Sequence, residues 1–474
     1  MTAAATAVAA PRVRTFFGHP IGLGFLVFAE AWERFSYYGM QSLLVLYMGQ
    51  QLLLPGHVEH VAGFSTFRGI IESAYGRLTP AALASVIFGL YAGGVYLTPL
   101  AGGFIADRWL GRTRTVALGA ILMAIGHFLM AFEVSFLAAL ACLLVGVGCF
   151  KGNIASQVGE LYAPGDLRRA DAFQVFLLAV NVAVIVSPLV CGTLGQKVAW
   201  HWGFGAAGVG MLIGLAVYLS GRRWLPPERV RPSRGEAPAK RPRLARGEGK
   251  TIAVLVAMLP VLALSGVGNQ EIFNAYLVWG QANYNLVFFG QTMPVTWLIS
   301  LDAIISSVTI VASVAFWRWW SKTRNEPQEI TKLAIGALIA GLAPLALTVA
   351  SLREAATGHK IGLFWGLVFH IVNDIGFANI FPVGIALFAR AGPRAILGLI
   401  IGIYYLNIFA GNMLVGYLGG LLGPLGGPKF WALHAALVFG AGIALMIFRA
   451  LFGKILSPTV DPEAVEALEA GQAA

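Results

Sequence analysis

The main pattern along the chain is a series of long apolar stretches separated by short polar segments. We count twelve stretches of the roughly 20 mostly apolar residues that a membrane-spanning helix needs. They are 20–50, 80–103, 113–131, 134–160, 170–194, 203–221, 251–280, 293–318, 331–351, 361–389, 395–424 and 430–453. The pattern therefore predicts an all-α polytopic membrane protein with twelve transmembrane helices.

One long polar segment, 222–250, separates the sixth stretch from the seventh. It is rich in Pro and Arg and lacks apolar periodicity, which is typical of a linker. Six spans on each side of it indicate two six-helix bundles, although no residue-level repeat relates the two halves. We expect an N-terminal bundle at 1–221, a basic cytoplasmic linker at 222–250, a C-terminal bundle at 251–454 and a cytoplasmic tail at 455–474.

The composition agrees with a membrane protein and excludes several other classes. Hydrophobic residues make up 58% of the chain and charged residues 12%, about half of the ~25% usual in a soluble domain. This balance excludes a soluble enzyme, a nucleic-acid-binding protein, a disordered chain and a disulfide scaffold. The cysteines, at 142, 149 and 191, lie in predicted spans without a metal-binding or disulfide spacing. We predict no metal site, no cofactor and no nucleic-acid partner.

The basic residues predict the orientation of the spans. With the N-terminus placed inside, 25 of the 33 Lys and Arg residues fall in cytoplasmic segments and six in outer segments. This bias follows the positive-inside rule. The first seventeen residues carry no separate apolar core, so we expect no cleavable signal peptide. The prediction is a multi-pass protein of the plasma (inner) membrane with both termini in the cytoplasm.

The charged residues inside the predicted spans are the first functional candidates. A charge at the membrane centre costs about 2.5–3.5 kcal/mol on insertion scales, so it is seldom present without a role. Both cations, Arg34 and Lys151, lie in the N-terminal half. The candidate acids of the C-terminal half are Glu271, Asp302 and Asp374. A cavity between the halves would therefore have one positive and one negative wall, which suits a zwitterion.

One face of the first span carries most of the remaining intramembrane chemistry. The helical period places five residues on that face, namely Glu30, Glu33, Arg34, Tyr37 and Tyr38. They could form a structural ion pair. They could also form a proton-coupled site, because a buried carboxylate beside a cation can exchange its salt bridge for a proton.

At these positions the sequence resembles the proton-dependent oligopeptide transporter (POT/PTR) family of the major facilitator superfamily, as a divergent bacterial-type member. The family's E-x-x-E-R-F motif and following Tyr pair are complete in residues 30–38. Its G-x-G-x-x-K-x-N motif occupies 146–153, and its second-span pattern is similar to residues 91–99. The superfamily loop motif occupies 103–112. The resemblance implies a major facilitator fold of two six-helix bundles.

The C-terminal half departs from the family pattern. Asn269-Gln270 stands where the family has an acid before Gln. Span 8 has Asp302 where the family has Asn, and span 10 has Phe377 where the family has Glu. Asp302 and Asp374 are candidates to compensate for the two missing acids. Glu271 lies roughly 200° round the helix from Asn269, so we expect it to face elsewhere.

The resemblance implies import of di- and tripeptides coupled to protons by alternating access. Arg34 and Lys151 would hold the peptide carboxylate, and Asp302 or Asp374 would hold the amine. Glu30 or Glu33 would pair with Lys151 when ionised, and protonation would free the lysine. Further substrate-binding candidates are Tyr37, Tyr38, Tyr96, Asn181, Asn269 and Tyr404. The candidates for the gate and loop motif are Asp107, Arg108, Gly111 and Arg112.

Other functions stay open at this point. The altered C-terminal positions also fit a proton-coupled transporter of the same family for a non-peptide small organic anion or zwitterion. A non-transporting membrane sensor is an alternative from another class. An enzyme is least supported, since we find no nucleophile triad, phosphate loop or metal spacing. The expected partners are a short peptide, protons and the lipid bilayer, and we expect a monomer.

Overall fold

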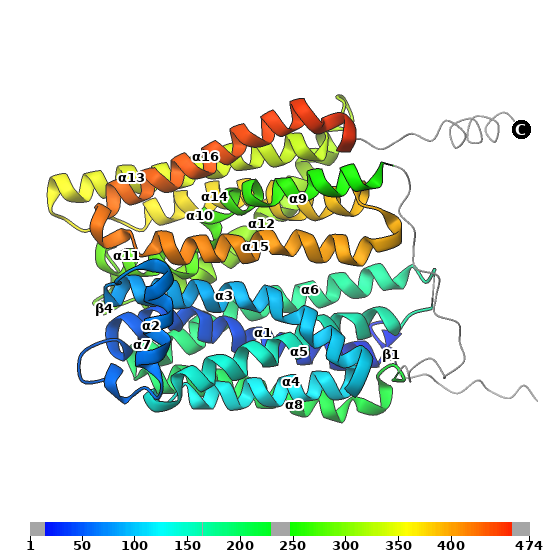
Figure 1. The fold of residues 1–474 in the computed structure, drawn as a ribbon, viewed down its shortest axis with the longest axis horizontal. Coiled ribbons are helices and arrows are strands. Elements are labelled where there is room, and N and C mark those ends of the chain that lie inside the picture. The colour runs from blue at the N-terminus through cyan, green and yellow to red at the C-terminus, as the bar shows by residue number, and fades with distance from the viewer. Residues whose placement is uncertain (1–14, 164, 229–246, 457–474) are drawn as a thin grey trace, which may run out of the picture.

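The computed structural model describes residues 15–163, 165–228 and 247–456, and it consists almost entirely of helices. The long helices lie roughly side by side in two bundles, with the N-terminal half below and the C-terminal half above in Figure 1. This arrangement confirms the predicted fold class. Most of the predicted linker and tail lies outside the described residues, as do Arg12 and Arg14.

The N-terminal bundle is formed by six long helices that correspond to the first six predicted spans. They are α1 (Gly22–Tyr47), α3 (Pro80–Ile105), α4 (Arg112–Leu129), α5 (Phe136–Glu160), α6 (Arg168–Ser187) and α8 (Trp200–Ser220). The shorter elements are β1 (Thr15–Phe16), β2 (His19–Pro20), α2 (Phe64–Tyr75), α7 (Thr193–Lys197), the π-helical turns η1 (Met48–Leu52), η3 (Ala106–Leu110) and η5 (Pro188–Gly192), and the 3₁₀ turns η2 (Val58–His60), η4 (Glu133–Ser135) and η6 (Arg222–Trp224).

The C-terminal bundle contains five long helices and one interrupted helix. The long helices are α12 (Trp297–Trp320), α13 (Glu329–Thr357), α14 (Phe364–Ala391), α15 (Leu397–Gly419) and α16 (Leu422–Leu456). The interrupted helix comprises α9 (Glu248–Ser265), α10 (Val267–Gln270), η7 (Glu271–Phe273) and α11 (Ala275–Asn283). The remaining elements are β3 (Val287–Phe288), β4 (Gln291–Thr292) and η8 (Arg394–Ile396).

Two predicted spans differ from the observed helices. The stretch 251–280 was expected to be one helix, but it breaks after Ser265 and again at Asn274, whose backbone is non-helical. Gly266 lies at the first break, and glycine lowers the cost of leaving the helix there. The stretch 395–424 ends early, and α16 begins before the predicted residue 430. Gly426 bends α16 near its start, with a φ of 69°.

Ten of the described helical segments are long and apolar enough to cross a membrane. The segments of α1 and α4 are not among them. In α1 the reason is the charged face of Glu30, Glu33 and Arg34, and α4 begins with two arginines. Exposed apolar side chains such as Val308 and Val311 on α12 would contact lipid. The chain is therefore a multi-pass membrane protein.

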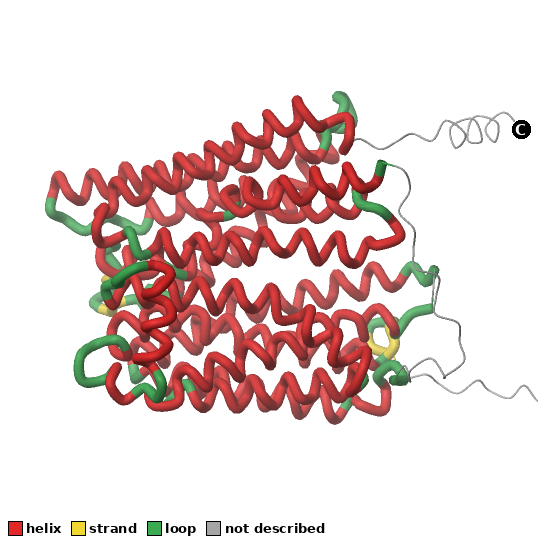
Figure 2. The backbone as a smooth tube through the Cα atoms, viewed as in Figure 1, coloured by secondary structure: helices red, strands yellow, loops and turns green. Residues whose placement is uncertain are grey.

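The two ends of the bundles differ, and we name them for what they carry. The "linker end", on the right of Figure 1, carries the β1–β2 hairpin and the start of α9. The "opposite end" carries α2, α7 and the β3–β4 hairpin. Figure 2 shows the two hairpins at these two ends. Each long helix therefore connects one end to the other.

The two bundles are joined by close backbone packing between α3 and α15. A Cβ atom built on Gly89 would lie 2.5 Å from the carbonyl oxygen of Asn412 and 2.6 Å from the Cα of Gly416. Real Cβ atoms do not approach so closely, so this contact requires a residue without a side chain. Small residues allow such close approach between membrane helices. The contact lies in the half of α3 nearer the opposite end.

Hydrogen bonds between the bundles reinforce the contact at the opposite end. Asn274 Nδ2 donates to Ser85 Oγ on α3 at 2.6 Å, and Ser300 Oγ donates to the carbonyl of Ile185 on α6 at 2.7 Å. Three more pairs lie at the same end, namely Gln50–Gln281, Thr296–Gln196 and Trp297–Thr193. These bonds hold the two bundles together on that side.

Candidate substrate and proton site

The charged face of α1 forms a buried ion cluster, as its spacing predicted. Arg34 Nε lies 3.0 Å from Glu30 Oε1 and 2.5 Å from Glu33 Oε2. The three residues are 5% or less exposed. Arg34 Nη2 is also buried and has no hydrogen-bond partner among the described residues. A buried guanidinium with an unused donor is suited to bind a carboxylate, because its fork matches that geometry.

Lys151 lies near this cluster but binds an aromatic ring. Its Nζ is 4.4 Å from the centroid of the Tyr96 ring, a cation–π contact. Tyr96 in turn stacks on Tyr405 of the C-terminal bundle, with ring centroids 6.3 Å apart. Lys151 therefore contacts Tyr96, and the Tyr96–Tyr405 pair joins the two bundles.

The predicted ion pair between Lys151 and a first-span carboxylate is not formed in this structure. Among the described residues, Lys151 has no carboxylate partner within 4 Å, while both Glu30 and Glu33 contact Arg34. Arg34 occurs one residue after Glu33 and four after Glu30, so it reaches both acids within one helix. Lys151 would have to approach from a neighbouring helix. The lysine is left with an ammonium that binds no acid in this conformation.

The tyrosines of α1 line the same region. The Arg34 guanidinium lies 5.4 Å from the Tyr37 ring centroid, and Tyr37 packs edge-on against Tyr38 at 5.1 Å. Tyr38 reaches the C-terminal bundle, where its ring lies 6.0 Å from that of Phe273. The predicted residues Tyr37, Tyr38 and Tyr96 are therefore brought together with the cations.

The C-terminal bundle contains a separate acidic cluster. Asp302 on α12 accepts a hydrogen bond from His370 Nδ1 on α14, at 2.8 Å. Asp374 is 1% exposed and close enough to Asp302 to interact electrostatically. Its Oδ1 accepts a hydrogen bond from Asn373 at 3.2 Å, and its Oδ2 has no hydrogen-bond partner in the part of the chain that the structure describes. The two predicted acids therefore lie together, and no described lysine or arginine pairs with them.

Three predicted substrate residues are not brought into these clusters. Tyr404 is 1% exposed, and its hydroxyl donates to the carbonyl of Phe381 at 2.9 Å. The next residue, Tyr405, makes the contact with Tyr96 instead. Asn269 on α10 is half-buried, and Asn181 on α6 is exposed. Neither makes a side-chain hydrogen bond among the described residues.

Glu271 belongs to neither cluster and lies beside the polar side chains of Asn274 and His434. Its side chain is fully buried, and its nearest charge partner is His434 on α16, with 3.8 Å between Oε1 and Nε2. His434 Nδ1 lies 2.8 Å from the carbonyl oxygen of Phe430, so Nδ1 carries a proton and donates it. Neither oxygen of Glu271 has a hydrogen-bond partner with good geometry.

The loop motif joins three helices at the linker end. Arg112, at the start of α4, lies 3.7 Å from Asp107 in η3 and forms an ion pair with Glu160 at the end of α5. Gly111 has a φ of 77°, which favours glycine, and a Cβ there would strike the carboxylate of Glu228. Arg108 lies over the Phe104 ring at 5.6 Å. Asp107, Gly111 and Arg112 thus fix the turn between α3 and α4.

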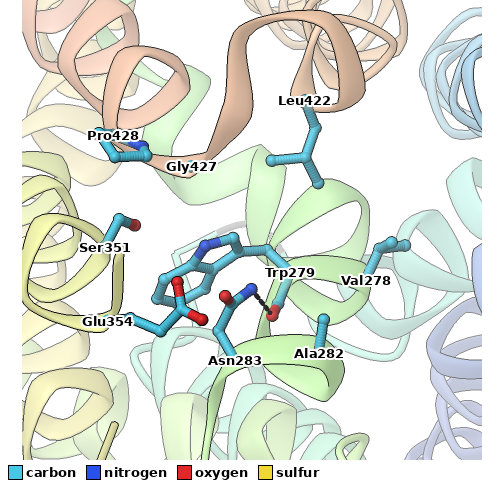
Figure 3. A pocket seen from close by; sticks show the side chains of 9 residues that line it. All are labelled: Val278, Trp279, Ala282, Asn283, Ser351, Glu354, Leu422, Gly427 and Pro428. Atoms are coloured by element: carbon cyan, nitrogen blue, oxygen red, sulfur yellow. Dashed lines mark hydrogen bonds between the residues drawn. The ribbon is translucent and has the colours of Figure 1, made fainter. Parts of the chain in front are cut away.

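A small cavity at the opposite end contains none of the predicted site residues. Its volume is about 230 Å³, and it lies between α11, α13 and the start of α16 (Figure 3). Trp279 and Glu354 line it, and the side chain of Asn283 donates to the Trp279 carbonyl at 2.7 Å. In the described part of the chain, no group of three or more His, Cys, Asp or Glu residues could hold a metal ion.

Sequence reasoning missed two contributors to the clusters. His370 was not among the candidate residues, because its pairing with Asp302 depends on how α12 and α14 pack. Tyr405 was passed over for Tyr404, although the two adjacent residues point to different sides of α15. The one available signal was the period of α14, which puts His370 and Asp374 one turn apart on one face.

Two helical bundles, with a buried ion cluster in one half and two buried aspartates in the other, have the arrangement of a major facilitator fold. The family model described as the POT family matches residues 113–241. The chain is 28% identical to the "Peptide transporter YePEPT" of Yersinia enterocolitica, over 88% of this chain and 90% of that protein. Identity is also 28% to the "Di-/tripeptide transporter" of Lactococcus lactis subsp. cremoris, over 92% and 96%.

The solved structures agree with the sequence matches. A crystal structure of "peptide transporter POT in complex with sulfate" superposes with a TM-score of 0.79 at 23% identity, covering 94% of this chain and 97% of that one. This likeness shows the fold. Together with the sequence matches, it supports the resemblance to the POT family that the motifs indicate.

Proposed function

We propose that this protein is a proton-coupled symporter that imports di- and tripeptides by alternating access. The observation that carries the proposal is the separation of charge between the two bundles. The N-terminal bundle presents Arg34 and Lys151, and the C-terminal bundle presents Asp302 and Asp374 without a basic partner. The similarity to proteins named as peptide and di-/tripeptide transporters supports the same substrate class.

The N-terminal cluster is suited to hold the peptide carboxylate. Arg34 keeps one buried donor without a partner, and Lys151 has no acid in this conformation. A carboxylate that entered between them would gain charge-assisted hydrogen bonds. Tyr37, Tyr38 and Tyr96 surround this position and would contact the peptide. The amine would then bind the acidic cluster of the opposite bundle, at Asp302 or Asp374.

The proton would bind to Glu30 or Glu33. Both carboxylates share Arg34, so the pair of acids and the guanidinium carry one net negative charge, which Lys151 balances. Protonation of one glutamate removes that excess and leaves Arg34 and Lys151 free to bind the substrate carboxylate. One proton that moves down 100 mV contributes about 2.3 kcal/mol, enough for roughly fifty-fold accumulation of a neutral substrate.

The conformation fits a carrier that is closed at the opposite end. The Gly89 packing and the Asn274–Ser85 bond join the bundles on that side. We assign the linker end to the cytoplasm because the lysines and arginines concentrate there. This orientation places both termini inside the cell, in the inner membrane. The protein would act as a monomer, driven by protons and without a cofactor.

Uptake into proteoliposomes with an imposed proton gradient tests the proposal. Labelled dipeptides should accumulate, and acetylation of the peptide amine should abolish uptake because the acidic cluster loses its ammonium partner. Glu30→Gln and Glu33→Gln should each reduce accumulation while exchange of labelled for unlabelled peptide persists. If both variants still concentrate peptide against a gradient, the glutamates do not couple the proton.

A second candidate function is transport of a non-peptide zwitterion or small organic anion by the same cycle. The observation that favours it is the loss of the family's acids at Asn269 and Phe377 and the placement of the acids at Asp302 and Asp374. The two functions can be distinguished by measuring whether unlabelled zwitterions or organic anions compete with the uptake of a labelled dipeptide. A dipeptide that neither enters nor competes would favour the second function.

A further inference from the structure

The C-terminal bundle contains a buried hydrogen-bonded chain that extends from Asp302 to three residues that the proposed function does not use. It starts at Asp302 Oδ1, which lies 2.8 Å from His370 Nδ1. His370 Nε2 lies 3.0 Å from the hydroxyl of Tyr276, which lies 3.3 Å from the hydroxyl of Tyr284. His370, Tyr276 and Tyr284 are fully buried, and Asp302 is 8% exposed. We propose that the Asp302–His370 pair is a second proton-binding site of the transport cycle.

The geometry allows His370 to exist in both protonation states. In the neutral state, Nδ1–H donates to Asp302 and Nε2 accepts from the Tyr276 hydroxyl. When a proton is added, Nε2–H donates to the Tyr276 oxygen, and the tyrosine hydroxyl turns toward Tyr284. The proton bound at Nε2 therefore finds an acceptor already in place. Unpaired buried donors are costly, so a site that serves both states lowers the barrier to a change in charge.

A proton on His370 would compensate negative charge in the acidic cluster. Asp302 and Asp374 interact electrostatically, and the groups that face them are His370, Tyr276 and Tyr284. With His370 neutral and both aspartates ionised, the cluster carries two negative charges and no basic side chain. One substrate ammonium balances one of these charges. A proton on His370 balances the other.

This balance couples the proton to the movement of the bundles. Closure over a site with an unpaired charge is strongly unfavourable, because desolvation is not repaid. Binding of both the ammonium and the proton therefore favours enclosure of the acidic cluster more than binding of either one alone. Joint loading of substrate and proton in this way is the behaviour of a symporter. The inference thus rests on the proposed function and adds a second coupled proton to it.

Tyr284, the last residue of this hydrogen-bonded network, lies near the opposite end of the bundles. Tyr284 packs edge-on against Trp279, with ring centroids 5.1 Å apart, and Trp279 lines the cavity shown in Figure 3. The buried network thus extends from Asp302 to the wall of that cavity. Its members come from α11, α12 and α14 and from the residue after α11, so a change of register between these helices would break it.

The test compares His370→Gln with a matched control. His127 on α4 is 1% exposed, lies in the other bundle and has no acid within ion-pair distance among the described residues, so His127→Gln controls for the loss of a buried histidine. The measurement is the proton-motive force at which net peptide flux is zero against a tenfold peptide gradient in proteoliposomes. A carrier that couples two protons to each peptide needs half the proton-motive force of a carrier that couples one. His370→Gln should therefore double the proton-motive force at zero flux. His127→Gln should leave it unchanged.

Peptide exchange separates the possible outcomes. His370→Gln should still exchange labelled for unlabelled peptide, although more slowly than the wild type, since exchange needs no net proton movement. If His370→Gln does not fold, Tyr276→Phe takes its place. It removes the acceptor of Nε2–H. The hydrogen bond between Tyr276 and protonated His370 is stronger than the one with neutral His370, because its donor is charged. Its loss should therefore shift the pH midpoint of driven uptake to lower pH.

Two results would overturn the inference. An unchanged balance force in His370→Gln, or an unchanged pH midpoint in Tyr276→Phe, would show that the pair carries no coupled proton, while the proposed transport would stand. Absence of peptide exchange by the wild-type protein would instead remove the proposed function and this inference with it.

Discussion

The close contact between Gly89 and α15 makes a quantitative prediction about the conformational equilibrium. Replacement by alanine adds one Cβ atom, which would lie 2.5 Å from a carbonyl oxygen and 2.6 Å from a Cα atom. Ordinary contacts begin near 3.4 Å, so the two backbones must separate by close to 1 Å. Overpacking of this kind costs about 1–3 kcal/mol. The cost applies to the state in which the bundles meet at the opposite end.

A cost of that size should shift the population measurably. About 1.4 kcal/mol changes an equilibrium constant tenfold, so Gly89→Ala should favour the state open at the opposite end by about 5- to 150-fold. Gly103 is on the same helix and has no heavy atom within 4 Å of a built Cβ. Gly103→Ala therefore adds the same methyl group without the clash and serves as the control.

Spin-label distances across the opposite end provide the assay. Leu54 and Phe289 lie in different bundles and are exposed, so a cysteine at each accepts a label. Cys142 is half-buried and would be replaced, whereas Cys149 and Cys191 are buried. Gly89→Ala should add a longer distance that the control lacks. If both variants give the wild-type distance distribution, the glycine contact does not determine the state.

Other contacts predict further results. Arg34→Gln leaves Glu30 and Glu33 buried without a cation and should lower the free energy of unfolding by about 3–5 kcal/mol. Addition of Glu33→Gln should partly restore the melting temperature, measured in detergent. Tyr218→Phe removes the 3.0 Å bond to Gln157 and should cost about 0.5–1.5 kcal/mol, measured as a lower melting temperature with unchanged peptide exchange. Tyr405→Leu removes the ring that stacks on Tyr96 and should weaken peptide binding in a titration, whereas Tyr404→Leu should mainly lower stability.

The fold was largely predictable because membrane spans follow from a local property. Twenty apolar residues form a helix in lipid wherever they occur, since the backbone has no other hydrogen-bond partners there. Breaks within a span were less predictable. The interruption after Ser265 depends on how α9 and α10 pack against α15 and α16, and the bend at Gly426 depends on a single backbone angle.

The site was predictable where its residues lie on one helix. Glu30, Glu33 and Arg34 needed only the helical period, and the structure joins them. Pairs formed between helices were not predictable in the same way. The partner of Asp302 is His370, 68 residues later, and its identity depends on the rotation of two helices about their axes.

The central claim is that a proton gradient drives the import of a short peptide through this protein. Its most direct test is the uptake of a labelled dipeptide by proteoliposomes under an imposed proton gradient. The proposed mechanism predicts accumulation above the external concentration, abolished by a protonophore and by acetylation of the peptide amine. Entry that stops at equal concentrations on both sides, or accumulation that a protonophore leaves unchanged, would contradict it.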